Sequence, residues 1–259
     1  MPTQTPNPQI MGILNLTPDS FFAASRAQDE YAISKRVDDM MSEGADIIDV
    51  GACSTRPDSV PVTAEEEMQR MRFGLEIISR RNAKIPLSID TFRPEVARMA
   101  VQEYGVTLIN DVTEGKYGMF EEVSRLHVGY VLTSVEPTIE RMIERFRKEL
   151  KTLDEMGENN VILDPGYGFG KDVITGNYAI LNRQQEIKSA FPNNKLLVGV
   201  SRKRMIWQLL GITPSESLAG TMCVNLLALE RGADILRVHD VKSADETVKI
   251  YKKCCSTSL

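Results

Sequence analysis

The sequence has little cysteine, histidine or tryptophan: four, two and one residue, respectively, in a chain of 259. The cysteines are Cys53, Cys223, Cys254 and Cys255, and their spacing resembles no zinc site. The chain also lacks an apolar run of membrane-spanning length, and residues 1–9 lack the basic and apolar segments of a signal peptide. We therefore expect a soluble cytoplasmic protein with reduced thiols and no membrane partner.

The sequence also has no excess of basic residues. The 31 Lys and Arg residues are outnumbered by 36 Asp and Glu residues, which gives a net charge of -5. Proteins that bind nucleic acid normally present a clustered basic surface, so we expect no nucleic-acid partner. An anionic substrate must then be held by local cations. The hydrophobic content of 42% is ordinary for a globular protein and supplies a sizeable core.

Eight short runs rich in Ile, Val and Leu recur between longer amphipathic stretches. The runs cover residues 10–14, 46–50, 86–89, 107–109, 130–132, 160–163, 195–200 and 234–238. They are nearly continuous, which is typical of parallel strands buried on both faces. Together with a length close to the roughly 250 residues of such folds, they favour a (β/α)₈ TIM barrel in one α/β domain, residues 1–259. Residues 1–8 and 253–259 are expected as flexible tails, and an open doubly wound sheet is the alternative.

Local signals place several helix ends. Gly44 stands where a left-handed C-terminal cap is needed, directly before a predicted strand. Residues 63–66 and 243–246 both fit the capping box, which predicts helices that begin near 64 and 244. Residues 44–50 are echoed at 232–238, and such repeated units build α/β folds.

Polar side chains gather where the predicted strands end: Asn15, Asp49, Asp90, Asn110, Asp111, Thr133, Asp164, Ser201 to Lys203, Arg237 and His239. The carboxyl ends of barrel strands open onto one face, so these side chains are expected to converge there. Each also has an ordinary interpretation when taken alone. Asp49, for example, caps a loop N–H or pairs with an arginine in that interpretation. Their shared location predicts a ligand site.

The glycine-rich stretch DPGYGFGK at 164–171 looks at first like a phosphate loop. It departs from that motif because Pro165 occupies the first glycine position and Asp172 follows Lys171. The leading Asp164 would repel a phosphate but would accept two parallel N–H donors. Tyr167 and Phe169 offer aromatic surface for a flat ring. The stretch therefore predicts a ring-binding loop, in which Lys171 has no assigned role.

Seven motifs together resemble the dihydropteroate synthase family of the folate pathway. They are MGILNLTPDSF at 11–21, DVGACSTRP at 49–57, SIDTFRPEVA at 88–97, INDV at 109–112, DPGYGFGK at 164–171, VGVSRK at 198–203 and RVHDV at 237–241. The resemblance implies a (β/α)₈ barrel that joins 6-hydroxymethyl-7,8-dihydropterin pyrophosphate to 4-aminobenzoate with the help of Mg²⁺. It also implies a homodimer, for which the apolar stretch 218–229 is the expected interface helix. Packing into the core of the chain explains the same apolar stretch equally well.

The resemblance further implies three sets of ligands. The pterin set is Asp90, Asn110, Asp164 and Lys203. The pyrophosphate set is Asn15, Thr55, Arg56, Arg237 and His239, with Asn15 as the contact nearest the metal. The 4-aminobenzoate set is Phe21, Pro57, Phe169 and Ser201. The implied catalytic residues are Asp90, Lys203, Arg237 and His239, in a reaction that cleaves C–O before it forms C–N.

The sequence departs from the common family pattern in three loops. Residues 132–135 read Leu-Thr-Ser-Val where many members carry a Met-His-Met segment, and Cys53 and Asp58 alter the second loop. Residues 22–25 of the first loop lack the flexible glycines often found there. Two alternatives remain. One is a pterin-binding methyltransferase barrel, which shares the fold and the pterin acids but uses methyltetrahydrofolate and a cobalt carrier. The other, which the altered second and fifth loops suggest, is a non-catalytic pterin-binding paralogue.

Overall fold

Eight parallel strands form a closed ring in the computed structural model, which describes residues 7–16, 26–53, 62–81 and 84–256. The strands are β1 (Gln9–Asn15), β2 (Ile47–Gly51), β3 (Leu87–Asp90), β4 (Leu108–Asp111), β5 (Gly129–Thr133), β6 (Val161–Asp164), β7 (Leu197–Val198) and β8 (Ile235–Val238). Their order is β6-β5-β4-β3-β2-β1-β8-β7. A parallel bridge between Leu163 and Leu196 joins the two ends of this order. The predicted TIM barrel is confirmed, and all eight strands lie within two residues of their predicted bounds.

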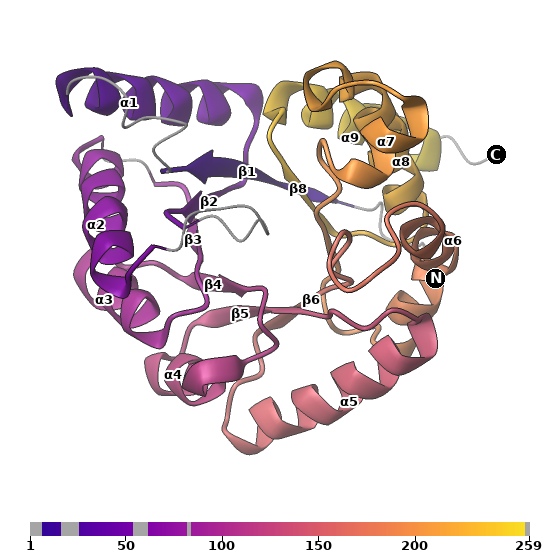
Figure 1. The fold of residues 1–259 in the computed structure, drawn as a ribbon, viewed down its shortest axis with the longest axis horizontal. Helices are drawn as coiled ribbons and strands as arrows, with labels where there is room; N and C mark the ends of the chain where they lie inside the picture. Colours follow the sequence, from indigo (N-terminus) through magenta and orange to yellow (C-terminus); the bar gives the residue numbers. More distant parts are fainter. Residues whose placement is uncertain (1–6, 17–25, 54–61, 82–83, 257–259) are drawn as a thin grey trace.

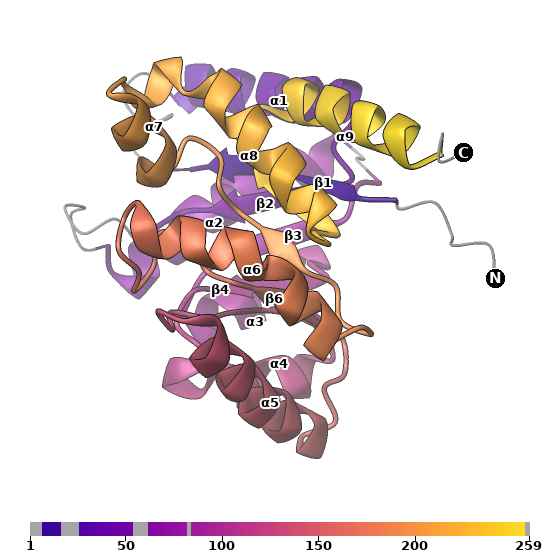
Figure 2. The ribbon, with the colours of Figure 1, turned by 90° about the vertical axis from the view of Figure 1, so that its right-hand side faces the viewer.

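Helices surround the strands on the outside of the barrel (Figure 1). They are α1 (Arg26–Glu43), α2 (Ala64–Arg80), α3 (Pro94–Tyr104), α4 (Met119–Leu126), α5 (Ile139–Glu155), α6 (Thr175–Ala190), α7 (Arg204–Leu210), α8 (Leu218–Glu230) and α9 (Val241–Ser256), with short 3₁₀ turns η1 (Lys116–Gly118) and η2 (Pro214–Glu216). In the side view of Figure 2, α7 lies at the end to which β1 points, and α9 ends at the opposite end. In the described parts of the chain, no helix has both the length and the apolar character needed to cross a membrane.

The predicted helix ends are confirmed in two places and wrong in a third. Thr63 and Glu66 form the expected capping box of α2, and Gly44 has a positive φ of 100° just after α1. The capping box predicted at Ser243 is wrong. Helix α9 already begins at Val241, because Ala244 N donates to Asp240 O over 3.1 Å. The helix also continues to Ser256, so residues 253–256, expected as part of a tail, are helical.

The inside of the barrel changes from apolar to polar along the strands. Seven buried apolar side chains form its own interior cluster: Met11, Ile47, Leu108, Val131, Ile162, Leu197 and Ile235. Side chains in a strand alternate between two faces, so the residue two positions later points to the same interior. On β2, β4, β5, β6 and β8 that residue is Asp49, Asn110, Thr133, Asp164 and Arg237. One closed apolar layer therefore supports a polar layer at the carboxyl ends of the strands.

Candidate active site

An arginine joins two carboxylates across the polar layer. Arg237 donates from Nε to Asp49 Oδ2 over 2.6 Å and from Nη2 to Asp90 Oδ2, also over 2.6 Å. Asn110 Nδ2 donates to the same Asp49 oxygen over 3.0 Å. Asp49 is fully buried, so it orients its two partners from beneath. The arginine-pairing interpretation of Asp49 is confirmed, although the sequence did not identify the partner.

Burial sets the protonation of these groups. It raises the pKa of Asp90 to about 6, against the opposing effect of Arg237. Burial also works against the charge of Arg237, but Asp49 and Asp90 outweigh it and raise the pKa of the guanidinium. Asp90 and Arg237 are therefore both charged at neutral pH. Perturbed carboxylates in a polar cleft are typical of functional sites.

A second pair of opposite charges lies at the ends of β6 and β7. Burial raises the pKa of Asp164 and lowers that of Lys203 to about 8, and each charge partly offsets the effect on the other. Asp164 Oδ1 accepts from Gly166 N over 2.8 Å, which leaves other lone pairs of the carboxylate for a ligand. Lys203 Nζ donates to Tyr167 O and lies 4.9 Å from the centre of the Phe169 ring. The structure thus brings one aromatic ring and both charges to the same part of the mouth.

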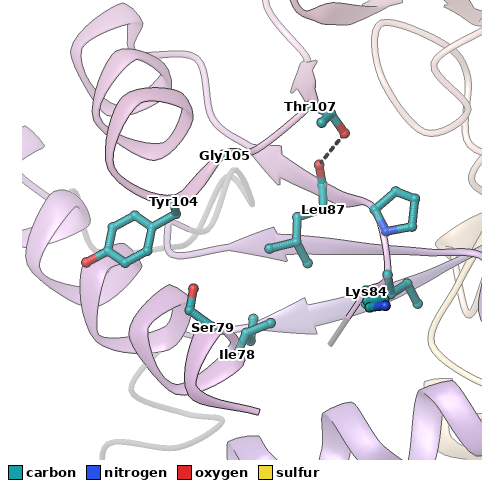
Figure 3. A pocket seen from close by; sticks show the side chains of 9 residues that line it. Ile78, Ser79, Lys84, Leu87, Tyr104, Gly105 and Thr107 are labelled. Carbon is teal, nitrogen blue, oxygen red and sulfur yellow. Dashed lines mark hydrogen bonds between the residues drawn. The ribbon is translucent and has the colours of Figure 1, made fainter. Parts of the chain in front are cut away.

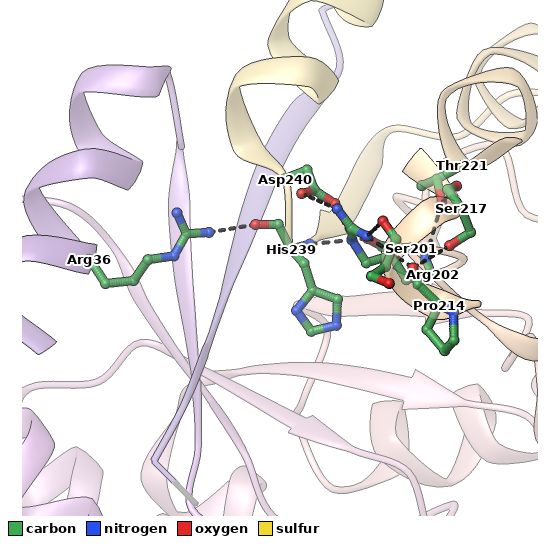
Figure 4. Close-up of polar contacts among 9 residues, drawn as sticks. Arg36, Ser201, Arg202, Pro214, Ser217, Thr221, His239 and Asp240 are labelled. Carbon is green, nitrogen blue, oxygen red and sulfur yellow. Dashed lines mark hydrogen bonds and ion pairs between the residues drawn. The ribbon is translucent and has the colours of Figure 1, made fainter. Parts of the chain in front are cut away.

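His239 is fixed through its backbone. Its N–H donates to Ser201 Oγ over 3.1 Å, and its carbonyl accepts from Arg36 of α1. The neighbouring Arg202 and Asp240 form a two-pronged ion pair of 2.8 and 2.9 Å that ties the loops after β7 and β8 together. Figure 4 shows the imidazole pointing away from this ion pair. The contacts set the position of His239 and leave the Ser201 hydroxyl able to donate its own hydrogen.

Asn15 ends β1 beside Asp90. A Cβ atom added to Gly51 would lie 3.6 Å from Asn15 Oδ1 and 3.5 Å from Asp90 Cβ, so both side chains flank this glycine. The remaining members of the predicted sets, Phe21, Thr55, Arg56 and Pro57, lie outside the described residues, as does Asp58. Cys53 ends the described part of the second loop, and burial raises the pKa of its thiol.

Three buried oxygens have no hydrogen-bond partner among the described residues and face the barrel interior: Asp49 Oδ1, Ser88 Oγ and Thr133 Oγ1. Thr133 and Asp164 are direct partners in the β5–β6 register, and Asp49 and Ser88 are partners in the β2–β3 register. Buried polar atoms are normally satisfied, so these three oxygens suit a polar ligand bound inside the barrel. The Leu-Thr-Ser-Val departure therefore places a hydroxyl beside the pterin set.

A separate hollow lies at the amino ends of β3 and β4. Its volume is about 340 Å³, and its lining includes Ile78, Lys84, Leu87, Tyr104 and Thr107 (Figure 3). Of the predicted site residues that the structure describes, none lines it. Barrel enzymes use the opposite face for chemistry, so the site lies with the polar layer at the carboxyl ends.

A family model matches most of the chain. Residues 11–239 match the family described as pterin binding enzyme. The matched range contains the whole polar layer and the whole pterin set, Asp90, Asn110, Asp164 and Lys203. The fold and the site thus define a pterin-binding barrel enzyme.

Similar sequences and structures indicate one family within this class. Dihydropteroate synthase of Escherichia coli strain K12 is 35% identical over 266 residues, which cover 96% of this chain and 93% of the relative. The Xanthomonas albilineans dihydropteroate synthase solved with 4-aminobenzoic acid superposes with a TM-score of 0.89 at 31% identity, covering 97% and 94% of the two chains. The Burkholderia cenocepacia dihydropteroate synthase complexed with 7,8-dihydropteroate superposes with a TM-score of 0.83 at 31% identity, covering 96% of this chain and 92% of that chain. The chain belongs to the dihydropteroate synthase family.

Proposed function

We propose that the chain condenses 6-hydroxymethyl-7,8-dihydropterin pyrophosphate with 4-aminobenzoate, forming dihydropteroate and pyrophosphate in folate biosynthesis. The observation that carries this proposal is the grouping of the pterin set, Asp90, Asn110, Asp164 and Lys203, around Asp49 and Arg237 of the polar layer, in a chain of this family. The relatives solved with 4-aminobenzoic acid and with 7,8-dihydropteroate support the choice of substrate and product.

The pterin would lie in the polar layer. Asp164 would accept the 2-amino and ring N–H donors, because a carboxylate matches two parallel donors and this one is oriented by Gly166. Lys203 would reach the ring carbonyl from the other side, leaving its present contact with Tyr167 O. Asn110 and Asp90 are held in place by Asp49 and Arg237, and would take further ring atoms. Preorganised polar groups of this kind bind a flat heterocycle without rearrangement of the strands.

The leaving group would lie toward Asn15 and His239. Arg237 uses N–H groups on Nε and Nη2 for the carboxylates, and a guanidinium carries five N–H donors in all. It can therefore contact an anion while it holds Asp90. Together with His239, and with Thr55 and Arg56 of the second loop, it would offset the charge that develops as the C–O bond breaks.

Mg²⁺ is the proposed cofactor, bound together with the pyrophosphate. Asn15 Oδ1 supplies one hard oxygen beside Asp90, and Mg²⁺ in phosphate sites commonly takes few protein ligands, with phosphate and water oxygens completing the octahedron. In the described ranges, no group of three or more His, Cys, Asp or Glu side chains is placed to hold a metal. When bound, the ion would neutralise charge on the departing pyrophosphate. Asn15 would orient that complex.

The second substrate would approach from the side of Phe169 and Ser201, with Phe21 and Pro57 as further apolar walls. Phe169 is partly exposed beside Lys203, and the Ser201 hydroxyl lies at the mouth with a hydrogen to donate to a carboxylate. The C–O bond would break first, and its bonding pair would leave with pyrophosphate. The amine lone pair would then form the C–N bond at the pterin methylene carbon, and the nitrogen would lose one proton. No covalent bond to the enzyme is needed.

We also propose that the enzyme is a cytoplasmic homodimer. Helix α8 exposes Leu227, and the adjoining α7 exposes Leu209 and Leu210 to 52% each. Exposed apolar side chains on two adjoining helices suit an interface between copies of the chain. Light scattering should give twice the chain mass, and replacing Leu209 with Glu should shift it toward the single-chain mass.

One assay tests the function. The protein is incubated with the pterin pyrophosphate, 4-aminobenzoate and Mg²⁺, and both pyrophosphate and dihydropteroate are measured, with the second substrate omitted in a control. Formation of both products in equal amounts is expected. Pterin binding without product would favour the non-catalytic paralogue, and methyl transfer from methyltetrahydrofolate to a cobalt carrier would favour the methyltransferase.

A further inference from the structure

The loop between β6 and α6 folds around an ammonium group of its own chain. Lys171 Nζ donates to three backbone carbonyls: Ser134 O at 3.1 Å, Gly166 O at 3.0 Å and Phe169 O at 2.9 Å. A lysine ammonium has three N–H donors, so the three carbonyls satisfy it completely. Two of the carbonyls belong to the loop itself, and the third belongs to the segment after β5.

The glycines of the loop make this arrangement possible. Gly166, Gly168 and Gly170 all have left-handed backbone, with φ of 65°, 86° and 63°. A Cβ atom would lie 2.1 Å from Ser134 O at Gly166 and 2.0 Å from Val135 O at Gly170. The glycines therefore let the loop curl tightly against the segment after β5. Carbonyl oxygens converge inside the curl, which makes it a cradle for a cation and not for a phosphate.

We infer that Lys171 is a positioning residue for substrate binding: it ties the β6 loop to the segment after β5 and so fixes Asp164 and Phe169 at the barrel mouth. Asp164 accepts from Gly166 N, and the carbonyl of the same Gly166 accepts from Lys171. Phe169 is held through its own carbonyl. The assignment rests on the proposed function, because Asp164 and Phe169 are its pterin and 4-aminobenzoate contacts.

The charge of Lys171 is part of this role. Burial lowers the pKa of Lys171 to about 8, while Asp164, Glu114 and Glu136 favour its charged form. Lys203 also lies close enough to interact with it. Loss of the proton leaves two donors for three carbonyls, so one of the three contacts of Lys171 would be lost at alkaline pH.

Lys188 offers a matched control. Its ammonium group also connects two loops, because it donates to Asn194 O over 2.9 Å and to Asp234 Oδ2 over 2.7 Å. These partners precede β7 and β8, so they lie at the amino ends of the strands, away from the site. Lys188→Met therefore reports what the loss of a partly buried lysine does to stability alone.

The test compares Lys171→Met, Lys188→Met and the wild type in the synthase assay and in pterin binding by calorimetry, at temperatures where all three are folded. We expect Lys171→Met to weaken pterin binding at least tenfold and to raise the KM for both substrates, while Lys188→Met stays within twofold of the wild type. The inference would be overturned if Lys171→Met and Lys188→Met had the same pterin affinity and the same KM values. A wild type that gives no dihydropteroate would instead contradict the proposed function.

A pH series separates the role of the ammonium from that of packing. The ratio of pterin affinities, wild type over Lys171→Met, should be at least ten at pH 7 and should shrink toward pH 9.5. Asp164, Glu114, Glu136 and Lys203 are present in both proteins, and the Lys171 charge lowers the pKa of Asp164 and of Lys203. The ratio therefore reports the loss of the Lys171 charge together with its effect on these two neighbours. A ratio that is constant over this range would show that the charged amine does not hold the loop.

Discussion

Arg237 Nη2 and Asp90 Oδ2 lie 2.6 Å apart, although β8 and β3 are separated in the barrel by β1 and β2. The contact spans the mouth because both side chains point inward from the carboxyl ends of their strands. Asp49 of β2 accepts from the same guanidinium, so three strands are joined through one side chain. The geometry of the pterin set thus depends on charges that are paired before any substrate binds.

The first prediction concerns the charge of Asp90. Its pKa is raised from 3.8 to about 6, mainly by burial, and only the ionised form can accept from both Arg237 and a ligand N–H. We expect kcat/KM to fall as pH decreases below about 6, with the slope of one proton. Asp90→Asn should remove this acidic limb and lower kcat/KM about 10- to 100-fold at pH 7, because Arg237 loses a charged partner.

The exposed Asp154→Asn on α5 serves as its control. This variant should keep both the activity and the acidic limb of the wild type. An Asp90→Asn enzyme with an unaltered acidic limb would assign that limb to another group.

The second prediction concerns the facing charges at the ends of β6 and β7. Asp164→Asn presents an N–H donor to ligand donors, and Lys203→Ala removes the donor for the ring carbonyl. Each should weaken pterin binding by roughly 1–3 kcal/mol, measured by calorimetry. The pKa of Lys203 is lowered to about 8, so pterin affinity of the wild type should also fall as pH rises through 8. Unchanged affinity in both variants would show that the pterin lies elsewhere.

The strands could be predicted well from the sequence because the side chains change from apolar to polar near the end of each strand. Ile47 is followed by Asp49, and Ile235 by Arg237, so an apolar residue gives way to a charged one on the same face. This change is visible within five residues and locates the polar layer without knowledge of the fold. It also placed Asp49 and Arg237 at the same level with opposite charges, a signal that could have identified their pairing.

What the sequence did not predict depends on contacts between distant segments. Asp49 and Arg237 are 188 residues apart, and Lys171 contacts Ser134 across 37 residues. No local pattern specifies which donor meets which carbonyl over such separations. The false capping box at Ser243 has a different cause: the motif is short, and Asp240 O already accepts the first bond of α9 three residues earlier.

The third prediction compares two glycines with nearly equal backbone. Gly105 and Gly170 have φ of 67° and 63°, but a Cβ at Gly105 has no neighbour within 4 Å, whereas at Gly170 it would lie 2.0 Å from Val135 O. Gly105→Ala should therefore cost only the backbone strain, about 1–2 kcal/mol. Gly170→Ala should destabilise the protein more than Gly105→Ala does. It should also weaken pterin binding, because the loop must move to accommodate the methyl group. Urea unfolding would measure the loss of stability, and calorimetry would measure pterin binding. Equal losses of stability in the two variants, with unchanged pterin binding by Gly170→Ala, would show that the contact with Val135 O does not matter.

The fourth prediction concerns Glu149 on α5. Its side chain is almost fully buried, Oε2 has no hydrogen-bond partner within the described residues, and Arg145 contacts the other oxygen. Burial raises the pKa of this carboxyl from 4.5 to about 7, with Arg145 opposing. The folded state therefore binds this proton more tightly than the unfolded state does. The stabilisation is complete below pH 4.5 and is lost as pH rises through 7.

Glu149→Gln removes this titration while it keeps the shape and one acceptor for Arg145. Between pH 5 and pH 8 the wild type should lose on the order of 2 kcal/mol of unfolding free energy relative to the variant. Urea unfolding at the two pH values measures the difference. The exposed Glu144→Gln on the same helix should follow the wild type. If Glu149→Gln and the wild type change in parallel between these pH values, Glu149 is already ionised at pH 5 and Arg145 outweighs the effect of burial.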